Sequence, residues 1–161
     1  MSKKGPLPFV VPSLDALDAL GEGEAPCDTL VLCMTTDTRP LVGAAGYADW
    51  RLCGRLSRLI ERGIVTGAPD EKVLVSSEGM LPMTRLLLFG FGPRERATND
   101  ARERLSRLVF VLGGLRARSI ALDLPPPGAP FMPLVDECLK KPLGDTLRVV
   151  FAPEEEPPHL V

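Results

Sequence analysis

The sequence predicts an α/β domain of three layers, α/β/α, with a mixed, mostly parallel sheet of about six strands. Short β-branched or leucine-rich runs alternate along the chain with longer segments of helical period, which is the pattern of this fold class. The 161 residues, 45% of them hydrophobic and 25% charged, suit one soluble globular domain. We expect that domain to span residues 1–152, followed by a disordered, acidic and proline-rich tail over 153–161.

The N-terminal part predicts a strand, a short helix and a second strand. Phe9–Val11 is a short apolar run, and Ser13 is a suitable N-cap for a helix with leucines on one side. The next run, Thr29–Cys33, is apolar without interruption and is flanked by polar residues. Such a run is typical of a strand that is covered on both faces.

A long helix is predicted from Gly43 to Gly63, because apolar residues recur there at intervals of three and four. Gly63 is a suitable residue to end it. The predicted buried face consists of Ala45, Ala48, Leu52, Leu56, Leu59 and Ile60.

Two antiparallel neighbouring strands are predicted next, over Lys72–Val75 and Arg85–Phe89, with a hairpin-like turn at 78–82. The segment Gly90–Pro93 is expected to break the second strand, because it combines two glycines with a proline.

A second long helix is predicted over 99–115, with Thr98 or Asn99 as its N-cap. Its second half, Leu108–Leu112, is apolar on nearly all sides. That half is therefore either buried on several sides or part of a contact between subunits.

The last third predicts two further strands with a short helix between them. Ser119–Leu124 is a strand-like run closed by three prolines, and Thr146–Phe151 is the final strand. The helix between them begins near Pro133 and is expected to stop at Pro142.

The residue types needed for common catalytic sites are scarce in this chain. The single histidine, His159, lies in the predicted tail, so no Ser-His-Asp or Cys-His pair can form inside the fold. Four scattered cysteines form no C-x-x-C motif and are predicted to be reduced thiols. We therefore predict no catalytic residue, no metal site and no cofactor, although an aspartate dyad or a lysine nucleophile stays open on composition.

The charge balance and the apolar runs restrict partners and location. Lys and Arg (19) nearly cancel Asp and Glu (21), which excludes a strongly basic binder of nucleic acid. No run approaches the roughly 20 apolar residues that span a bilayer. We expect a cytoplasmic protein without a membrane partner.

Two glycine-bearing loops follow predicted strands and precede helices, where backbone N–H groups can hold a phosphate. They span 39–46 and 90–94, and neither has a Walker or dinucleotide motif. Tight turns at strand ends are the alternative interpretation. The candidate ligand-binding residues in these loops are Arg39, Gly43, Gly46, Gly90 and Gly92.

Arginines recur at helical spacing on the polar side of the first long helix. They could contact an acidic protein or nucleic-acid phosphates, or form an ordinary solvated face. This candidate interaction surface consists of Arg51, Arg55, Arg58 and Arg62.

Residues 28–124 resemble the N-terminal, non-catalytic domain of the leucine (cytosol) aminopeptidases. The resemblance rests on the strand Thr29–Leu32, the loop 39–46, the helix segment Asp49–Ser57 with its DWRLCGRLS sequence, and the LLLFGFG run at 86–92. It implies a macro-domain-like fold. In the family the peptidase reaction belongs to a separate C-terminal domain with two metal ions, whose Asn-Thr-Asp-Ala-Glu-Gly-Arg motif has no counterpart here.

The resemblance implies a free-standing accessory domain, and we predict a non-enzymatic interaction or regulatory module that contacts a protein partner or itself. The alternative is a nucleotide or ADP-ribose-type ligand module, since macro domains bind ADP-ribose. In this chain Met34–Asp37 stands where those domains have an Asn-Ala-Ala-Asn-like segment. A further alternative is nucleic-acid binding through the arginines.

Overall fold

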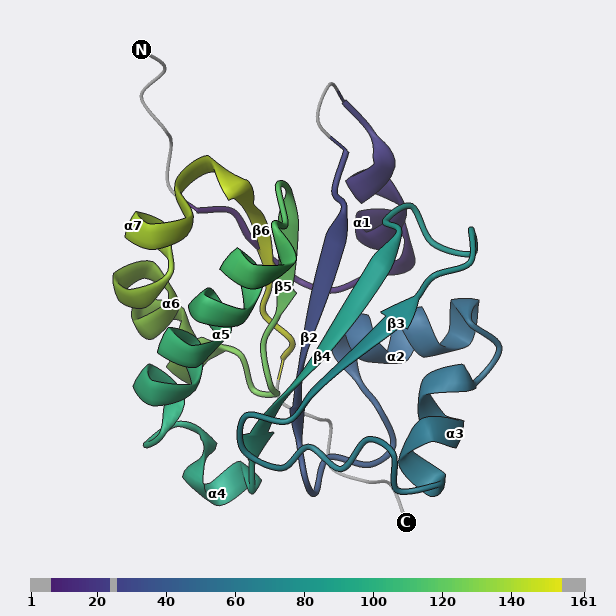
Figure 1. The fold of residues 1–161 in the computed structure, drawn as a ribbon, viewed down its shortest axis with the longest axis horizontal. Coiled ribbons are helices and arrows are strands. Elements are labelled where there is room, and N and C mark those ends of the chain that lie inside the picture. Colours follow the sequence, from purple (N-terminus) through teal and green to yellow (C-terminus); the bar gives the residue numbers. More distant parts are fainter. Residues whose placement is uncertain (1–6, 24–25, 155–161) are drawn as a thin grey trace.

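The computed structural model describes residues 7–23 and 26–154, which form one six-stranded sheet between two layers of helices (Figure 1). The strand order is β1-β6-β5-β2-β4-β3. The predicted α/β class and three-layer architecture are confirmed. The strands are β1 (Phe9–Val10), β2 (Thr29–Thr35), β3 (Lys72–Ser76), β4 (Arg85–Gly92), β5 (Ile120–Asp123) and β6 (Leu147–Phe151).

Four of the five strand pairings are parallel, and only β3 runs antiparallel to its neighbour β4. In that pair Leu74 lies opposite Leu87, so the predicted antiparallel neighbours are correct. The central strands β2 and β5 are buried along their whole length. This burial explains why their sequences are apolar without alternation.

The helices divide into two layers. They are α1 (Leu14–Asp18), α2 (Gly43–Arg51), α3 (Arg55–Glu61), α4 (Arg94–Ala97), α5 (Ala101–Leu115), α6 (Met132–Cys138) and α7 (Lys140–Leu143). Side chains of α1, α2 and α3 pack on one face of the sheet, and those of α5 and α6 pack on the other (Figure 1).

The prediction of one continuous helix from Gly43 to Gly63 is wrong, because the chain forms α2 and then α3. Cys53 and Gly54 adopt left-handed backbone conformations, with φ of 57° and 80°, and end the first helix. Apolar periodicity continues across the break: Ala48, Leu52 and Leu56 are all buried. The pattern therefore indicated the buried face correctly but could not reveal a turn that preserves that face.

The end of strand β4 was also predicted in the wrong place. Strand β4 does not stop at Gly90 but continues through Gly92 beside Thr35 of β2, with a register shift between Met34 and Thr35. Instead, the glycines allow another segment of the chain to pass close to the strand. A Cβ on Gly90 would lie 1.8 Å from the Ala68 carbonyl oxygen of the segment that crosses the end of the strand.

Helix α5 begins at Ala101, with Asp100 as its N-cap residue and no side-chain cap, so neither Thr98 nor Asn99 has the predicted role. Leu108 and Leu112 of its apolar half are buried, whereas the Phe110 side chain is 85% exposed. Burial on several sides is therefore excluded for this half-helix. The proposed subunit contact stays a prediction.

The last predicted helix stops earlier than expected. Helix α6 ends at Cys138, and a separate short helix, α7, then includes Pro142 within its single turn. The prediction that Pro142 is the stop was wrong because proline is tolerated in a first helical turn.

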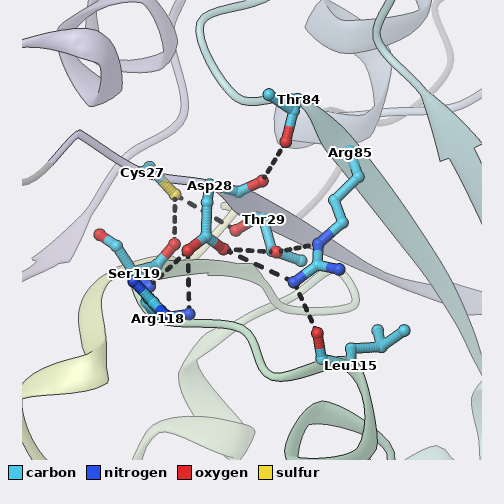
Figure 2. A network of polar contacts seen from close by, with 8 residues as sticks. All are labelled: Cys27, Asp28, Thr29, Thr84, Arg85, Leu115, Arg118 and Ser119. Atoms are coloured by element: carbon cyan, nitrogen blue, oxygen red, sulfur yellow. Dashed lines mark hydrogen bonds and ion pairs between the residues drawn. The ribbon is translucent and has the colours of Figure 1, made fainter.

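The amino ends of β2, β4 and β5 are joined by a polar network around Asp28 (Figure 2). The Asp28 carboxylate accepts hydrogen bonds from the backbone N–H groups of Arg118 and Ser119 at 2.9 and 3.1 Å. The Arg85 guanidinium donates to the Thr29 hydroxyl at 2.8 Å and to the Leu115 carbonyl at 3.0 Å. Side-chain hydrogen bonds therefore connect the three strands at this end of the sheet, which indicates a structural role for the network.

The predicted tail and His159 fall largely outside the described residues, which end at Glu154. Ala152, Pro153 and Glu154 form no helix or strand. None of the helices within 7–23 and 26–154 has both the length and the apolar character that a bilayer crossing requires.

Candidate functional site

The connections at the carboxyl ends of the parallel strands leave the sheet in opposite directions. The chain passes from β2 to α2 on one face, whereas β4 and β5, its two neighbours, lead to α5 and α6 on the other. In open α/β sheets such a switch of direction opens a crevice, and ligands bind there. The candidate site is therefore at the carboxyl ends of β2 and β5.

A small cavity of about 20 Å³ lies in this crevice. That volume holds about one water molecule and no nucleotide. Its polar lining comes from β2, from the loop that follows and from the end of β5. The residues concerned are Thr35, Thr38, Arg39 and Asp123.

Asp123 occupies the N-terminus of α2. Its carboxylate accepts hydrogen bonds from the backbone N–H groups of Ala44 at 3.4 Å and Ala45 at 3.1 Å. The residue at the N-cap, Val42, has no side-chain acceptor, so Asp123 caps the helix from another strand. Desolvation by burial raises the pKa of Asp123 to about 8, against the opposing effect of these two hydrogen bonds.

The Asp123 carboxyl group lies at a helix end that commonly binds anions. A helix N-terminus is a natural anion site because its first N–H groups lack partners within the helix. Here a side-chain carboxyl takes the position in which a phosphate would bind. The loop after β5 adds Pro125, Pro126 and Pro127, which have no N–H to donate.

Backbone conformation and close contacts explain why glycine occupies positions 43 and 46 of the first predicted ligand loop. Gly43 has a φ of 63°, and a Cβ there would lie 3.3 Å from an oxygen of Asp123 and 3.2 Å from Cβ of Pro153. A Cβ on Gly46 would lie 2.9 Å from the Leu41 carbonyl oxygen. Both positions require glycine whether or not a ligand binds.

Arg39 donates hydrogen bonds to backbone carbonyl groups, two of them in the segment just before it. Its guanidinium donates to the backbone carbonyls of Thr35 at 3.1 Å, Thr38 at 2.7 Å and Thr66 at 3.4 Å. The arginine thus joins the loop after β2 to the segment that precedes β3.

The second predicted ligand loop faces this crossing segment. The Gly90 N–H donates to the Glu71 carbonyl at 2.8 Å, and the Gly92 N–H donates to the Gly67 carbonyl at 2.9 Å. The structure therefore gathers Arg39, Gly43 and Gly46 on one side of the crevice and places Gly90 and Gly92 on the neighbouring strand. Ligand binding by these five residues stays a prediction.

An apolar groove of about 560 Å³ lies farther along the same sheet edge, at the ends of β1, β5 and β6. Its volume is in the range of small-molecule pockets. The lining residues that matter here are Phe9, Val11, Pro127, Met132 and Pro153.

A second groove, of about 520 Å³, lies on α2 and contains two exposed aromatic rings. Trp50 is 67% exposed and Tyr47 is 37% exposed. We call this groove the Trp50 surface, and define it by Leu14, Leu41, Val42, Gly43, Gly46, Tyr47 and Trp50. Sequence reasoning missed it, although Trp50 falls outside the predicted buried face and is the only tryptophan in the chain.

The four predicted interface arginines are divided between α2 and α3, and their role as a contact surface stays a prediction. Arg51 pairs with Asp18 at 2.7 Å and lies with its guanidinium carbon 5.7 Å from the Trp50 ring centroid. Arg55 pairs with Glu78 at 3.2 Å, and Arg58 donates to the Cys53 carbonyl at 2.8 Å. Arg62, the fourth, ends α3 at its C-cap.

The cysteines are free thiols, and two of them are poor nucleophiles. Burial raises the pKa of Cys27 to about 11 and raises that of Cys33 as well. Over residues 7–23 and 26–154, no three or more His, Cys, Asp or Glu side chains converge as a metal site would need.

Solved structures with the same arrangement define the class of protein. The macrodomain of Thermus aquaticus DarG superimposes with a TM-score of 0.56 at 22% identity, over 96% of this chain and all of that one. The macrodomain of Mycobacterium tuberculosis DarG gives 0.59 at 18%, over 93% and 99% of the two chains. The fold is therefore that of a macrodomain.

The sequence places the chain within a particular family. Residues 31–129 match the model of the cytosol aminopeptidase family, N-terminal domain, and the chain belongs to that family. A tomato leucine aminopeptidase mutant superimposes with a TM-score of 0.55 at 14% identity, over 97% of this chain but only 35% of that one. The family model that matches is that of the N-terminal domain. No curated protein sequence matches the chain.

Proposed function

We propose that this domain is a non-catalytic interaction module that contacts a protein partner, in the first instance a second copy of itself, through the Trp50 surface. The observation that carries the proposal is the exposure of Trp50 and Tyr47 beside Arg51 on one helix. Tryptophan, tyrosine and arginine are the residue types that dominate the binding energy of protein interfaces.

The crevice at the sheet edge supports a role without catalysis. Its carboxyl group, Asp123, caps α2, and its arginine, Arg39, is bonded to backbone carbonyls. Neither group is left to activate a water molecule or a nucleophile. Hydrolysis of aminoacyl amides by a clean preparation with added manganese or zinc would contradict the proposal.

Sedimentation velocity over a wide concentration range tests the contact surface. We expect self-association of the unchanged chain, and weaker association of Trp50→Ala and of Tyr47→Ala. Phe110→Ala removes an exposed ring from α5, on the opposite layer, and tests the alternative subunit contact predicted for that half-helix. If the chain is a monomer at every concentration, the proposed self-association is wrong. If Phe110→Ala and Trp50→Ala weaken association equally, the contact is not specific to the Trp50 surface.

A nucleotide or ADP-ribose-type ligand is the second candidate function, favoured by the 560 Å³ groove at the sheet edge. One macrodomain of the same fold, from Oceanobacillus iheyensis, was solved with ADP, at 13% identity and a TM-score of 0.50. Against this candidate, the α2 N–H groups are occupied by Asp123. Calorimetry with ADP and ADP-ribose tests it, and the absence of heat at millimolar ligand would end it.

Nucleic-acid binding through the arginines has weaker support, because Arg51 and Arg55 are paired with carboxylates. A phosphate-dominated mode requires that affinity fall steeply as salt rises. Titration of a labelled duplex at two salt concentrations separates this mode from the others.

A further inference from the structure

We propose that two copies of this chain pair through the free edge of β3, antiparallel and with Leu74 opposite its counterpart, so that the two sheets join into one. This edge shares no residue with the Trp50 surface, so the inference goes beyond the function proposed above. It rests on the backbone groups, the exposed side chain and the charges of this one strand.

Strand β3 is the last strand of the sheet and has a neighbour on one side only (Figure 1). At its two ends, the Glu71 carbonyl accepts a backbone hydrogen bond from the β4 side at 2.8 Å, and the Ser77 N–H donates one to that side at 3.0 Å. In an antiparallel pair, alternate residues bond to the neighbouring strand. The odd-numbered residues therefore bond to β4, and the backbone N–H and C=O groups of Lys72, Leu74 and Ser76 face outward.

This edge lacks the features that keep a sheet edge unpaired. Such edges are commonly very short, contain a bulge or a proline, or carry several charges. Strand β3 has five residues, pairs with β4 without a register shift, contains no proline and has a single charge, Lys72, at its first position. The opposite edge strand, β1, has only two residues. Of the two edges, β3 is therefore the one that can accept another strand.

Leu74 lies in the middle of β3, and its side chain is 51% exposed. It lies opposite Leu87 of β4, which belongs to the core beneath α5. Leu74 therefore continues this apolar face beyond the last described strand. When two β3 strands pair with Leu74 at the centre, the two leucines lie directly opposite each other. Such a cross-strand contact buries apolar surface that a single copy exposes.

The charges of the strand favour a second copy as the occupant. In the proposed register Lys72 lies opposite Ser76 of the other copy, with Glu78 of that copy on the diagonal, within reach of a long side chain. Within the strand, no two like charges lie opposite each other. Arg55 donates to the Ser76 carbonyl at 3.4 Å and pairs with Glu78 at 3.2 Å. A carbonyl has two lone pairs, so Ser76 can also accept a bond from a second strand.

Disulfide trapping tests the pairing in the full chain. Cys53 and Cys138 are first replaced by serine, so that the remaining natural thiols are buried. Opposite residues of a hydrogen-bonded antiparallel pair have Cα atoms about 5.5 Å apart, a separation that a disulfide spans. We therefore expect Leu74→Cys in this background to form a covalent dimer under mild oxidation.

Lys72→Cys and Ser76→Cys are matched controls for the register. In the proposed pairing each lies four residues from its own counterpart, or about 13 Å at about 3.4 Å per residue, which is too far for a disulfide. Neither variant should dimerise alone, whereas an equal mixture should give the mixed dimer. If Leu74→Cys stays monomeric, or if all three single variants crosslink to the same extent, the proposed pairing is wrong.

Sedimentation velocity in a Trp50→Ala background measures the β3 contact separately from the association proposed above. Leu74→Pro removes an outward N–H and no hydrogen bond to β4, as proline does at a sheet edge. Two hydrogen bonds are lost per dimer, so the dissociation constant should rise about tenfold or more. Leu74→Lys retains the N–H but places two charges opposite each other, and it should also weaken association. Ile64→Lys, at a site that is 52% exposed, should not.

The outcomes distinguish this inference from the proposed function. A Trp50→Ala protein that is monomeric at every concentration would overturn the β3 pairing and leave the Trp50 surface as the contact. Equal dissociation constants for Leu74→Lys and Ile64→Lys would also overturn it, even if the proline variant fails to fold. Association that persists in Trp50→Ala and is lost in Leu74→Lys would support it.

Discussion

The Asp123 carboxylate accepts a hydrogen bond from the Ala45 N–H at 3.1 Å, and so a side chain from β5 closes the N-terminus of the helix that follows β2. The contact joins residues 78 positions apart in the chain. It fixes α2, and with it the Trp50 surface, against the end of the sheet. The Ala44 and Ala45 N–H groups at this helix N-terminus therefore have an acceptor within the chain.

Stability should fall as pH rises through the range between the ordinary pKa of an aspartate and that of Asp123. Its pKa is raised from 3.8 to about 8, so the folded state binds more protons than the unfolded state between these values. Urea unfolding at pH 5 and pH 8.5 should show a lower free energy of unfolding at the higher pH. Asp123→Asn mimics the protonated form and should reduce this difference. An equal pH dependence in both proteins would contradict the assignment.

Removing the cap altogether should weaken α2. Asp123→Ala leaves the Ala44 and Ala45 N–H groups without acceptors, and loss of such a cap costs about 1 kcal/mol. Asp18→Ala is a suitable control, because it removes an exposed partner of Arg51. Exposed pairs contribute about 0.2–1 kcal/mol, so the control should lie at or below the cost of the lost cap. Chemical denaturation at pH 5 compares the two variants.

Gly90→Ala should be strongly destabilising. The added Cβ would lie 1.8 Å from a backbone oxygen of Ala68, which cannot move away as a flexible side chain could. Overpacking of this kind costs about 3 kcal/mol. Gly113→Ala is the matched control, since nothing lies within 4 Å of its Cβ position on α5, and it should stabilise the helix by about 0.5–1 kcal/mol. Thermal denaturation should move the melting temperature in opposite directions.

The two faces of α2 and α3 should respond differently to truncation. Leu56 is fully buried, and Leu56→Ala should cost about 2–5 kcal/mol of unfolding free energy. Trp50 is largely exposed, and Trp50→Ala should change stability by about 0.5 kcal/mol or less, as surface substitutions do. Unfolding followed by circular dichroism measures both. A large loss of stability in Trp50→Ala would mean that the ring serves the fold and is not free to bind.

The Asp28 network should contribute more than its partial exposure suggests. Asp28→Ala leaves the Arg118 and Ser119 N–H groups without their acceptor, as well as the Thr29 hydroxyl that donates to it at 2.7 Å. Unsatisfied groups of this kind cost about 1–3 kcal/mol in total when they stay buried. Asp28→Asn retains an acceptor oxygen and should lose less. Equal losses in the two variants would assign the effect to packing.

Local sequence predicted most of the elements, and each of its failures has a physical cause in the structure. Apolar periodicity located the buried face shared by α2 and α3 because burial follows the helical repeat. It could not show the break at Cys53 and Gly54, because the residues on both sides of the turn bury the same face. The glycines of β4 suggested a strand end, whereas their reason lies in the segment at 67–71, which crosses the strand from elsewhere in the chain.

The candidate site was less accessible to sequence reasoning. The two loops predicted to bind a ligand do lie next to each other, since the carboxyl ends of β2 and β4 share one edge of the sheet. The Trp50 surface was missed because a single exposed aromatic residue carries no pattern. Its exposure depends on which neighbours fail to cover it.

The sequence by itself determined the fold class, the order of the strands and the buried face of the first long helical segment, because each of these depends on the order and spacing of apolar residues along the chain, and its motifs indicated the family. Only the tertiary structure decided that Asp123 caps α2, that Gly90 lies under Ala68 and that Trp50 faces solvent. These are contacts between segments far apart in sequence, or the absence of such contacts. No local pattern encodes them, since they arise only when the whole sheet brings those segments together.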